Sequence, residues 1–194
     1  MKKSLNLKDY ILKLNNWIPE TIVKQTKLDL ENDKNWKRHT YSDSKNSKIL
    51  THNGEKELSV IVKNDITYFN EIHDFIWKAL EKYIVKDKIG GDTFSGWSGF
   101  TTIRYNRYME GQLMDKHSDH IHTIFDGERK GIPILSILGS LNNDYEGGEF
   151  IMFDDYKIDL KAGDVLIWPS VFLYEHRVEP LKKGIRYSFV SWCW

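Results

Sequence analysis

The C-terminal half of the chain is built from short segments of high β-propensity, each followed by residues that favour turns. The segments at 100–105, 112–117, 134–141, 149–153, 156–160, 164–168, 174–178 and 186–194 are each expected to form a strand. Turn signals such as Gly147-Gly148 and Lys183-Gly184 separate them. So many short strands in about a hundred residues predict a sandwich or barrel of the jelly-roll type.

Residues 1–95 are expected to form a helical and irregular support region. The spacing of Leu7, Tyr10, Ile11 and Leu14 predicts a first helix, which Asn6 caps and Pro19 ends. The clearest helix is predicted over 67–86, where apolar residues form one stripe. Residues 31–57 are polar and predict a loop or a marginal hairpin, and 58–62 a strand. We therefore expect a mainly β (α+β) protein of one domain, residues 1–194. Its double-stranded β-helix (jelly-roll) core spans 96–194, with the N-terminal helices packed on one sheet.

The composition excludes few classes of protein, but it indicates the kind of partner and the redox environment to expect. The chain is 40% hydrophobic, which is normal for a globular protein. Lys+Arg and Asp+Glu both total 28, and this balance gives no support to a nucleic-acid partner. Cys193 is the single cysteine, so no internal disulfide forms, and this is typical of a reducing, cytoplasmic protein. No signal peptide and no membrane span is expected, and the sequence carries no signal for an oligomeric state.

Three residues have the spacing of a metal site. His117 and Asp119 are two positions apart, so in an extended segment both side chains point to the same face. Together with the distant His176 they form the two-histidine, one-carboxylate set that holds Fe(II) and leaves coordination positions open. His120 and His122 form an alternative ligand pair, similar to that of a cupin-type metalloenzyme. Otherwise these two residues are loop residues near the mouth of the site.

The last predicted strand carries a cation. Alternation along 186–194 places one set of residues on a single face: Arg186, Ser188, Val190, Trp192 and Trp194. A guanidinium on an inward, apolar face requires an anionic partner, because an unpaired buried charge is costly. The planar fork of arginine binds a carboxylate through two hydrogen bonds.

From Thr101 to Trp194 the chain resembles the Fe(II)/2-oxoglutarate-dependent oxygenases, specifically their prolyl 4-hydroxylase-like branch. Five segments in order carry the resemblance. They are 104–119 with its Tyr, Gly and His-x-Asp; 138–149, which ends in Gly-Gly-Glu; 161–168 with Lys-Ala-Gly-Asp; 175–180 with Glu-His-Arg-Val-Glu-Pro; and 183–188 with Lys-Gly-Ile-Arg-Tyr-Ser.

The resemblance implies roles for single residues. His117, Asp119 and His176 would bind iron, and Arg186 would bind the distal carboxylate of 2-oxoglutarate. Tyr108 would line the co-substrate pocket, Trp192 would pack beside it, and Ser188 would assist Arg186. Some relatives have a tyrosine in the strand after the metal pair that helps to hold the co-substrate, whereas this chain has Leu-Gly-Ser at 138–140. Tyr108 and Ser188 are therefore the candidate hydroxyls beside Arg186.

The resemblance also implies an activity. With Fe(II), 2-oxoglutarate and O2, and with ascorbate as a candidate further cofactor, the chain would hydroxylate a C–H bond and release succinate and carbon dioxide. The substrate would be a prolyl or other residue of a peptide or protein, or a small molecule. Loops at 42–55 and 122–131 are candidates for a substrate lid. A jelly-roll binding or structural module without catalysis is the alternative of a different class.

Overall fold

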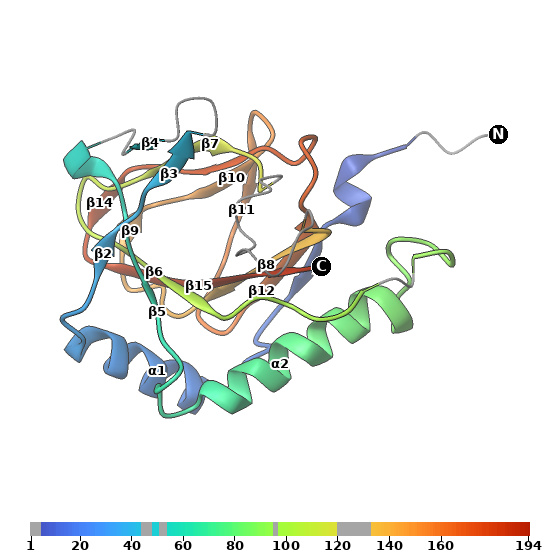
Figure 1. The fold of residues 1–194 in the computed structure, drawn as a ribbon, viewed down its shortest axis with the longest axis horizontal. Coiled ribbons are helices and arrows are strands. Elements are labelled where there is room, and N and C mark those ends of the chain that lie inside the picture. The colour runs from blue at the N-terminus through green and yellow to red at the C-terminus, as the bar shows by residue number, and fades with distance from the viewer. Residues whose placement is uncertain (1–4, 44–47, 51–53, 95–96, 120–132) are drawn as a thin grey trace.

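The computed structural model describes residues 5–43, 48–50, 54–94, 97–119 and 133–194. Its centre is a pair of facing sheets in which all strand pairings between neighbours are antiparallel (Figure 1). The predicted mainly β, jelly-roll core is confirmed. The predicted lid segments lie largely outside the described residues.

The larger sheet has seven strands and includes three from the N-terminal region. Its order is β1 (Leu12–Leu14), β12 (Val165–Pro169), β8 (Leu135–Ser140), β15 (Arg186–Cys193), β6 (Arg104–Tyr108), β5 (Ser59–Val62) and β2 (Lys37–Arg38). The smaller sheet has the order β11 (Tyr156–Ile158), β10 (Phe150–Met152), β13 (His176–Val178) and β7 (Met114–His117). Two short ribbons complete the sheets, β14 (Leu181–Lys183) with β9 (Glu146–Gly147) and β3 (Tyr41–Asp43) with β4 (Lys48–Leu50).

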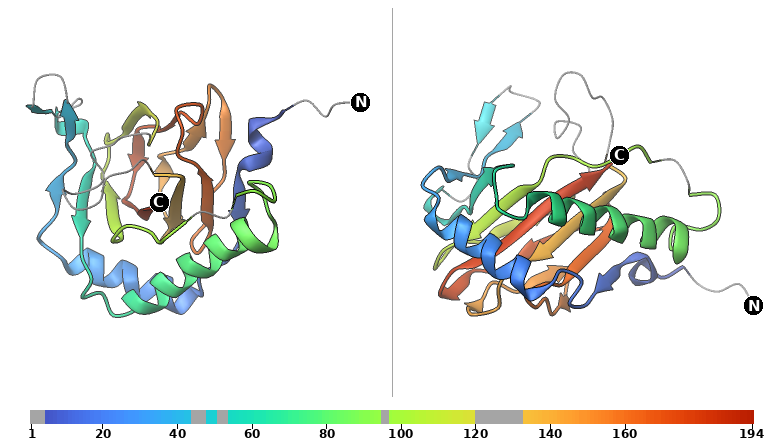
Figure 2. Two further views of the ribbon diagram at one scale, coloured as in Figure 1. Left: turned by 45° about the vertical axis from the view of Figure 1, so that its right-hand side comes forward. Right: turned by 90° about the horizontal axis from the view of Figure 1, so that it is seen from below.

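Two helices cover the outer face of the larger sheet, as predicted. They are α1 (Glu20–Asn32) and α2 (Phe69–Glu81), and they lie below the strands in Figure 1 and in front of them in the right-hand view of Figure 2. The apolar stripe of α2, with Ile72, Ile76 and Leu80, is fully buried in the layer between helices and sheet. A second apolar core fills the space between the two sheets. The larger sheet is therefore buried on both faces.

Strand β15 separates these two cores by side-chain parity. Tyr187, Phe189 and Cys193 point to the helices, whereas Val190 and Trp192 belong to the core between the sheets. Trp194 packs on the helical side instead, so its predicted place on the inner face is wrong. The strand ends at Cys193, and alternation ends with it.

The neighbouring strand β8 approaches β15 closely at one glycine. Gly139 pairs with Phe189, and a Cβ atom at Gly139 would lie 2.0 Å from the Phe189 ring. The aromatic ring therefore occupies the space that any larger residue at this position would need.

The N-terminal region differs most from the prediction. Asn6 does cap a helix, but this is the single 3-10 turn η1 (Leu7–Tyr10), and the chain then forms β1 on the edge of the larger sheet. Pro19 begins α1 rather than ending a helix, which agrees with its preference for helix N-termini. The helix predicted over 67–86 consists of α2 and a π-helical turn, η3 (Lys82–Lys86). Short 3-10 helix η2 (Gly54–Lys56) precedes β5.

One strand in the C-terminal half is displaced from its predicted position. The segment predicted at 100–105 forms β6 at Arg104–Tyr108, four residues later at its start. The preceding residues instead run beside the end of β15, where the Thr101 amide donates to the Trp192 carbonyl at 2.9 Å.

Candidate metal centre

Two strands of the smaller sheet bring the predicted ligands together. His117 ends β7 and His176 begins β13, and the two residues are directly opposite each other in the antiparallel pairing. Asp119 follows β7 by two residues. One ligand atom from each of His117, Asp119 and His176 lies within 4.8 Å of the other two. The sequence spacing thus correctly predicted that these three side chains lie close together.

Both imidazoles are held in the tautomer that a metal requires. The Nδ1 atom of His117 lies 2.7 Å from the Asp115 carbonyl oxygen, and that of His176 lies 3.1 Å from the Tyr174 carbonyl oxygen. A carbonyl only accepts hydrogen bonds, so each Nδ1 carries the proton and each Nε2 has a free lone pair. These Nε2 atoms lie 3.6 Å and 3.9 Å from the two Asp119 oxygens, His117 facing one and His176 the other.

The surroundings shift the pKa of two of these groups, His176 and Asp119. Burial lowers the pKa of His176 to about 4, His117 acts in the same direction, and Asp119 opposes both. For Asp119, burial opposes ionisation, but His176, His117 and a hydrogen bond from Ser136 outweigh it and hold its pKa well below the usual range. A carboxylate and neutral imidazole are the states in which these side chains bind metals.

A hydroxyl from the larger sheet orients the carboxylate. Ser136 on β8 donates to Asp119 Oδ2 at 2.6 Å and shares a second hydrogen bond of 2.8 Å with Ser170. Trp168 packs edge-on against His176, with ring centroids 5.0 Å apart. Partners that orient metal ligands contribute to affinity almost as directly as the ligands. Sequence reasoning missed Ser136, although a polar residue in an otherwise apolar strand was a signal for it.

Arg186 lies on the inner face of β15, in a buried position that is 1% exposed. Its Nε donates to the Tyr145 hydroxyl at 3.3 Å, and its guanidinium carbon lies 4.9 Å from the centre of the Tyr108 ring. Within the described residues, Nη1 has no hydrogen-bond partner. A buried cation with a free donor fits an anionic ligand such as a carboxylate.

The three other predicted co-substrate residues have different positions. Tyr108 is opposite Arg186 in the strand pairing, and burial raises the pKa of its hydroxyl while the Arg186 charge opposes this rise. Ser188 is fully buried, and its hydroxyl has no hydrogen-bond partner within the described residues. Trp192 is opposite Ser136, at the metal end of the strand. Tyr145 is a third hydroxyl that the sequence interpretation did not consider.

The path of the backbone near Arg186 explains why the Tyr145 hydroxyl lies beside the guanidinium. The hairpin after β8 bends back over β15, where the side-chain oxygen of Asn142 accepts from the Tyr187 amide at 2.7 Å. Gly148 has a positive φ of 62°, and a Cβ there would lie 3.3 Å from Arg186 Cδ. The Gly-Gly turn thus lets the hairpin come close enough for Tyr145 to reach the guanidinium.

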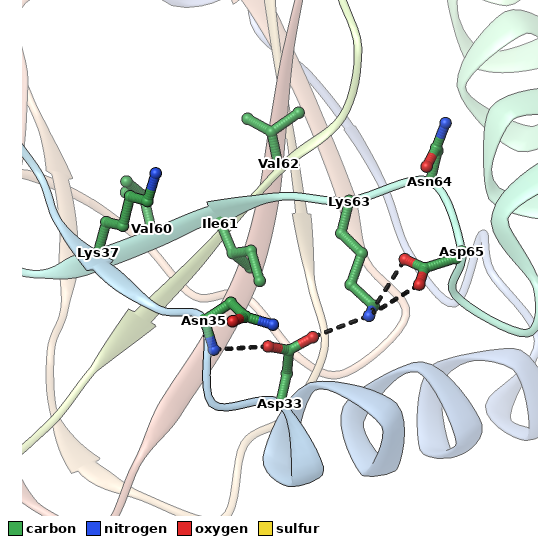
Figure 3. A pocket seen from close by; sticks show the side chains of 9 residues that line it. All are labelled: Asp33, Asn35, Lys37, Val60, Ile61, Val62, Lys63, Asn64 and Asp65. Atoms are coloured by element: carbon green, nitrogen blue, oxygen red, sulfur yellow. Dashed lines mark hydrogen bonds and ion pairs between the residues drawn. The ribbon is translucent and has the colours of Figure 1, made fainter.

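Two predicted residues have no described position, and one pocket within the described residues lies apart from the centre. His120 and His122 lie outside the described residues, so the alternative ligand pair has no position here. A hollow on the outer side near α1 and β5 is lined by Asp33, Asn35, Lys37, Val60, Ile61, Val62, Lys63, Asn64 and Asp65 (Figure 3). There the Lys63 ammonium pairs with Asp33 at 2.8 Å and Asp65 at 3.1 Å. Both carboxylates of the hollow thus pair with Lys63, and none of the metal-centre residues lines it.

A jelly roll with a His-x-Asp and a distal His on facing strands, and a buried arginine on the final strand, defines the architecture of an Fe(II)-dependent oxygenase. Comparison with known proteins agrees. Residues 103–194 match the 2OG-Fe(II) oxygenase superfamily. This match covers a little under half of the chain, and the members of the superfamily use Fe(II), 2-oxoglutarate and O2.

The curated relatives include PKHD-type hydroxylases. The protein from Idiomarina loihiensis is 34% identical over 93 residues, which cover 46% of this chain and 40% of the relative. The protein from Psychrobacter is 37% identical over 94 residues, covering 45% of this chain and 36% of the relative. The matched part therefore spans about two fifths of the length of these relatives.

Solved structures of prolyl hydroxylases share the fold. A prolyl hydroxylase from Trichoplax adhaerens, solved with a hypoxia inducible factor peptide fragment, has a TM-score of 0.70 at 18% identity and covers 96% of this chain and 84% of its own. A prolyl-4-hydroxylase from Pseudomonas putida has a TM-score of 0.66 at 16% identity, covering 95% and 91%. The chain thus shares its fold with these prolyl hydroxylases. Within the described residues, no helix has both the length and the apolar character needed to cross a membrane.

Proposed function

We propose that this chain is an iron- and 2-oxoglutarate-dependent dioxygenase that hydroxylates a C–H bond and releases succinate and carbon dioxide. The observation that carries the proposal is the position of two complementary sites on one barrel interior. His117, Asp119 and His176 offer three ligand atoms within 4.8 Å, and the buried Arg186 offers a cation for a dicarboxylic acid.

The donor set fits the implied metal. Two neutral nitrogen atoms and one carboxylate oxygen, grouped on one side, suit Fe(II) and leave positions for other ligands. When bound, the iron together with 2-oxoglutarate and O2 supplies the oxidising chemistry. The residues of this chain would hold and orient the metal and the co-substrate, and they would exclude water from the site. Ser136 fixes the Asp119 carboxylate, and the carbonyls of Asp115 and Tyr174 fix the imidazoles.

Arg186 has the matching task for the co-substrate. Its guanidinium is held between the Tyr108 ring and the Tyr145 hydroxyl, so little side-chain freedom is lost when a carboxylate binds. The chemistry that iron and 2-oxoglutarate would supply needs no protein base, which agrees with the apolar inner core around the centre. Trp168 and Phe150 pack on His176, with ring centroids 5.0 Å and 5.4 Å away, and keep water from that ligand.

The substrate class that we propose from the relatives is a residue of a peptide or protein, and a small molecule is the alternative. The Trichoplax enzyme was solved with a peptide fragment, which supports the first. The single, buried Cys193 supports a reducing, cytoplasmic environment.

The proposal is tested in two stages. Anaerobic addition of Fe(II) and then 2-oxoglutarate should produce a weak visible charge-transfer band, and Arg186→Ala should weaken 2-oxoglutarate binding by about 2 kcal/mol or more. Incubation in air with ascorbate and a library of peptides and amino acids should then give succinate and a mass gain of one oxygen. A protein that binds neither metal nor 2-oxoglutarate, yet binds a partner stoichiometrically, would instead be a non-catalytic jelly-roll module.

A further inference from the structure

Three small polar residues form a row on the inner face of the larger sheet. Ser188 lies two residues after Arg186 on β15 and therefore points to the same face. It is opposite Ser140 of β8 on one side and opposite Asn106 of β6 on the other. Asn106 has the parity of Tyr108, which belongs to the core between the sheets. The polar row Ser140, Ser188 and Asn106 thus crosses three neighbouring strands.

The members of the polar row differ in their hydrogen bonds. The Ser140 hydroxyl donates to the Asn142 carbonyl at 3.2 Å, so its donor is already used. Ser188 is fully buried and Asn106 is 3% exposed. Within the described residues, neither the Ser188 hydroxyl nor the side-chain oxygen of Asn106 has a hydrogen-bond partner. Buried polar groups are normally paired, because leaving them unpaired costs free energy. The unpaired end of the row therefore indicates a place where a polar ligand binds.

The polar row lies between the two ends of the proposed co-substrate site. Along β15 it follows Arg186 by two residues, or about 7 Å. Trp192 is four residues further on and is opposite Ser136, whose hydroxyl donates to Asp119 of the metal centre. A dicarboxylic acid that binds Arg186 at one end and the metal at the other therefore runs past the polar row.

Asn106 offers such an acid a different contact from that of Arg186. A primary amide has two N–H donors and one oxygen acceptor, and it carries no charge. The keto oxygen of a 2-oxo acid and the carboxylate beside it only accept hydrogen bonds. Residues directly opposite each other in a ladder have Cβ atoms about 5 Å apart. A small rotation of both side chains would therefore let the Ser188 hydroxyl donate to the Asn106 oxygen, which leaves the amide N–H groups for the ligand.

We propose that Asn106 binds the co-substrate, donating a hydrogen bond from its side-chain amide to an oxygen atom of the 2-oxo acid end. The inference deepens the proposed function and rests on it for the identity of the bound molecule as 2-oxoglutarate. Arg186 binds the distal carboxylate by charge, and Asn106 positions the opposite end of the same molecule. The two residues thus hold the acid at two points along the wall.

The test measures binding, so it does not depend on turnover. In isotope-labelled protein loaded with Zn(II), the side-chain amide resonances of Asn106 are assigned by their absence in Asn106→Leu. Addition of 2-oxoglutarate should shift them downfield and slow their exchange with water, since a new hydrogen bond forms. The Kd of 2-oxoglutarate should rise at least about tenfold in Asn106→Leu, because a hydrogen bond to a charged group is lost.

Stability provides a readout that a structural role would not share. In the ligand-free protein the Asn106 side-chain oxygen is buried without a partner, so leucine should leave the urea midpoint unchanged or raise it. Ser140→Ala is the matched control, because Ser140 belongs to the same row but its hydroxyl is bound to a backbone carbonyl. This variant should keep the Kd of the parent.

Two results would overturn the inference alone. One is an unchanged Kd in Asn106→Leu, and the other is a set of Asn106 amide resonances that do not respond when the parent binds 2-oxoglutarate. A weaker Kd with lower stability and no resonance shift would make Asn106 a structural residue. If Asn106→Leu does not fold, Asn106→Ser assigns the resonances and the parent's response decides. A parent that binds Zn(II) but no 2-oxoglutarate would contradict the proposed function, and this inference with it.

Discussion

Replacing Tyr145 by phenylalanine removes one oxygen atom beside the cation that we assign to 2-oxoglutarate. The ring would keep its packing, but Arg186 Nε would lose the acceptor that lies at 3.3 Å. A hydrogen bond to a charged group contributes roughly 1.5–3 kcal/mol. The distance is at the long end of the usual range, so we expect a loss of about 1.5 kcal/mol.

This loss should divide between stability and binding in a particular way. Nε lacks its acceptor both with and without the co-substrate, so the larger part should appear as a lower free energy of unfolding. Binding is weakened only because the guanidinium becomes less well oriented, and we expect the Kd of 2-oxoglutarate to rise roughly threefold.

The assay combines urea unfolding of the metal-free protein with anaerobic titration of 2-oxoglutarate into the Fe(II)-loaded protein. Tyr156→Phe, on β11 of the other sheet, is the matched control. A double-mutant cycle with Arg186→Met isolates the pair, because the effect of Tyr145→Phe should vanish once the guanidinium is absent. Equal stability and a Kd within twofold of the parent would refute the orienting role of Tyr145.

Three further perturbations test the centre and its frame. Ser136→Ala removes the 2.6 Å hydrogen bond to Asp119 and should weaken Mn(II) binding about tenfold, measured by titration against the free ion; unchanged affinity would contradict the orienting role. Gly139→Ala places a Cβ 2.0 Å from Phe189 and should lower the free energy of unfolding by about 1–3 kcal/mol, seen as a lower urea midpoint. The pKa of His39 falls from 6.5 to about 3 on folding, so between these values the unfolded chain binds the extra proton and stability decreases as pH falls. His39→Asn should make this decrease shallower by about 1 kcal/mol per pH unit, and parallel stability curves would show that His39 does not cause it.

The sequence predicted the position of a side chain correctly where that position depends on a single strand. Parity alone placed Arg186 and Trp192 on the inner face of β15, and the two-residue spacing of His117 and Asp119 predicted their convergence. The same alternation gave the wrong face for Trp194, because the strand ends before this residue. The prediction of a first helix was wrong for another reason. The apolar spacing from Leu7 to Leu14 fits a helix, but Leu12–Leu14 pairs with the edge of β12 as a strand.

Contacts between residues of two different elements could not be predicted from the sequence of either element alone. Tyr145 reaches Arg186 only because the Gly-Gly turn folds its hairpin over β15, and Ser136 reaches Asp119 only because β8 lies across the barrel from β7. In the proposed function the motif residues would hold the metal and the co-substrate, and this role is the same for any substrate. Selectivity must therefore arise from inward residues outside those motifs that still face the metal.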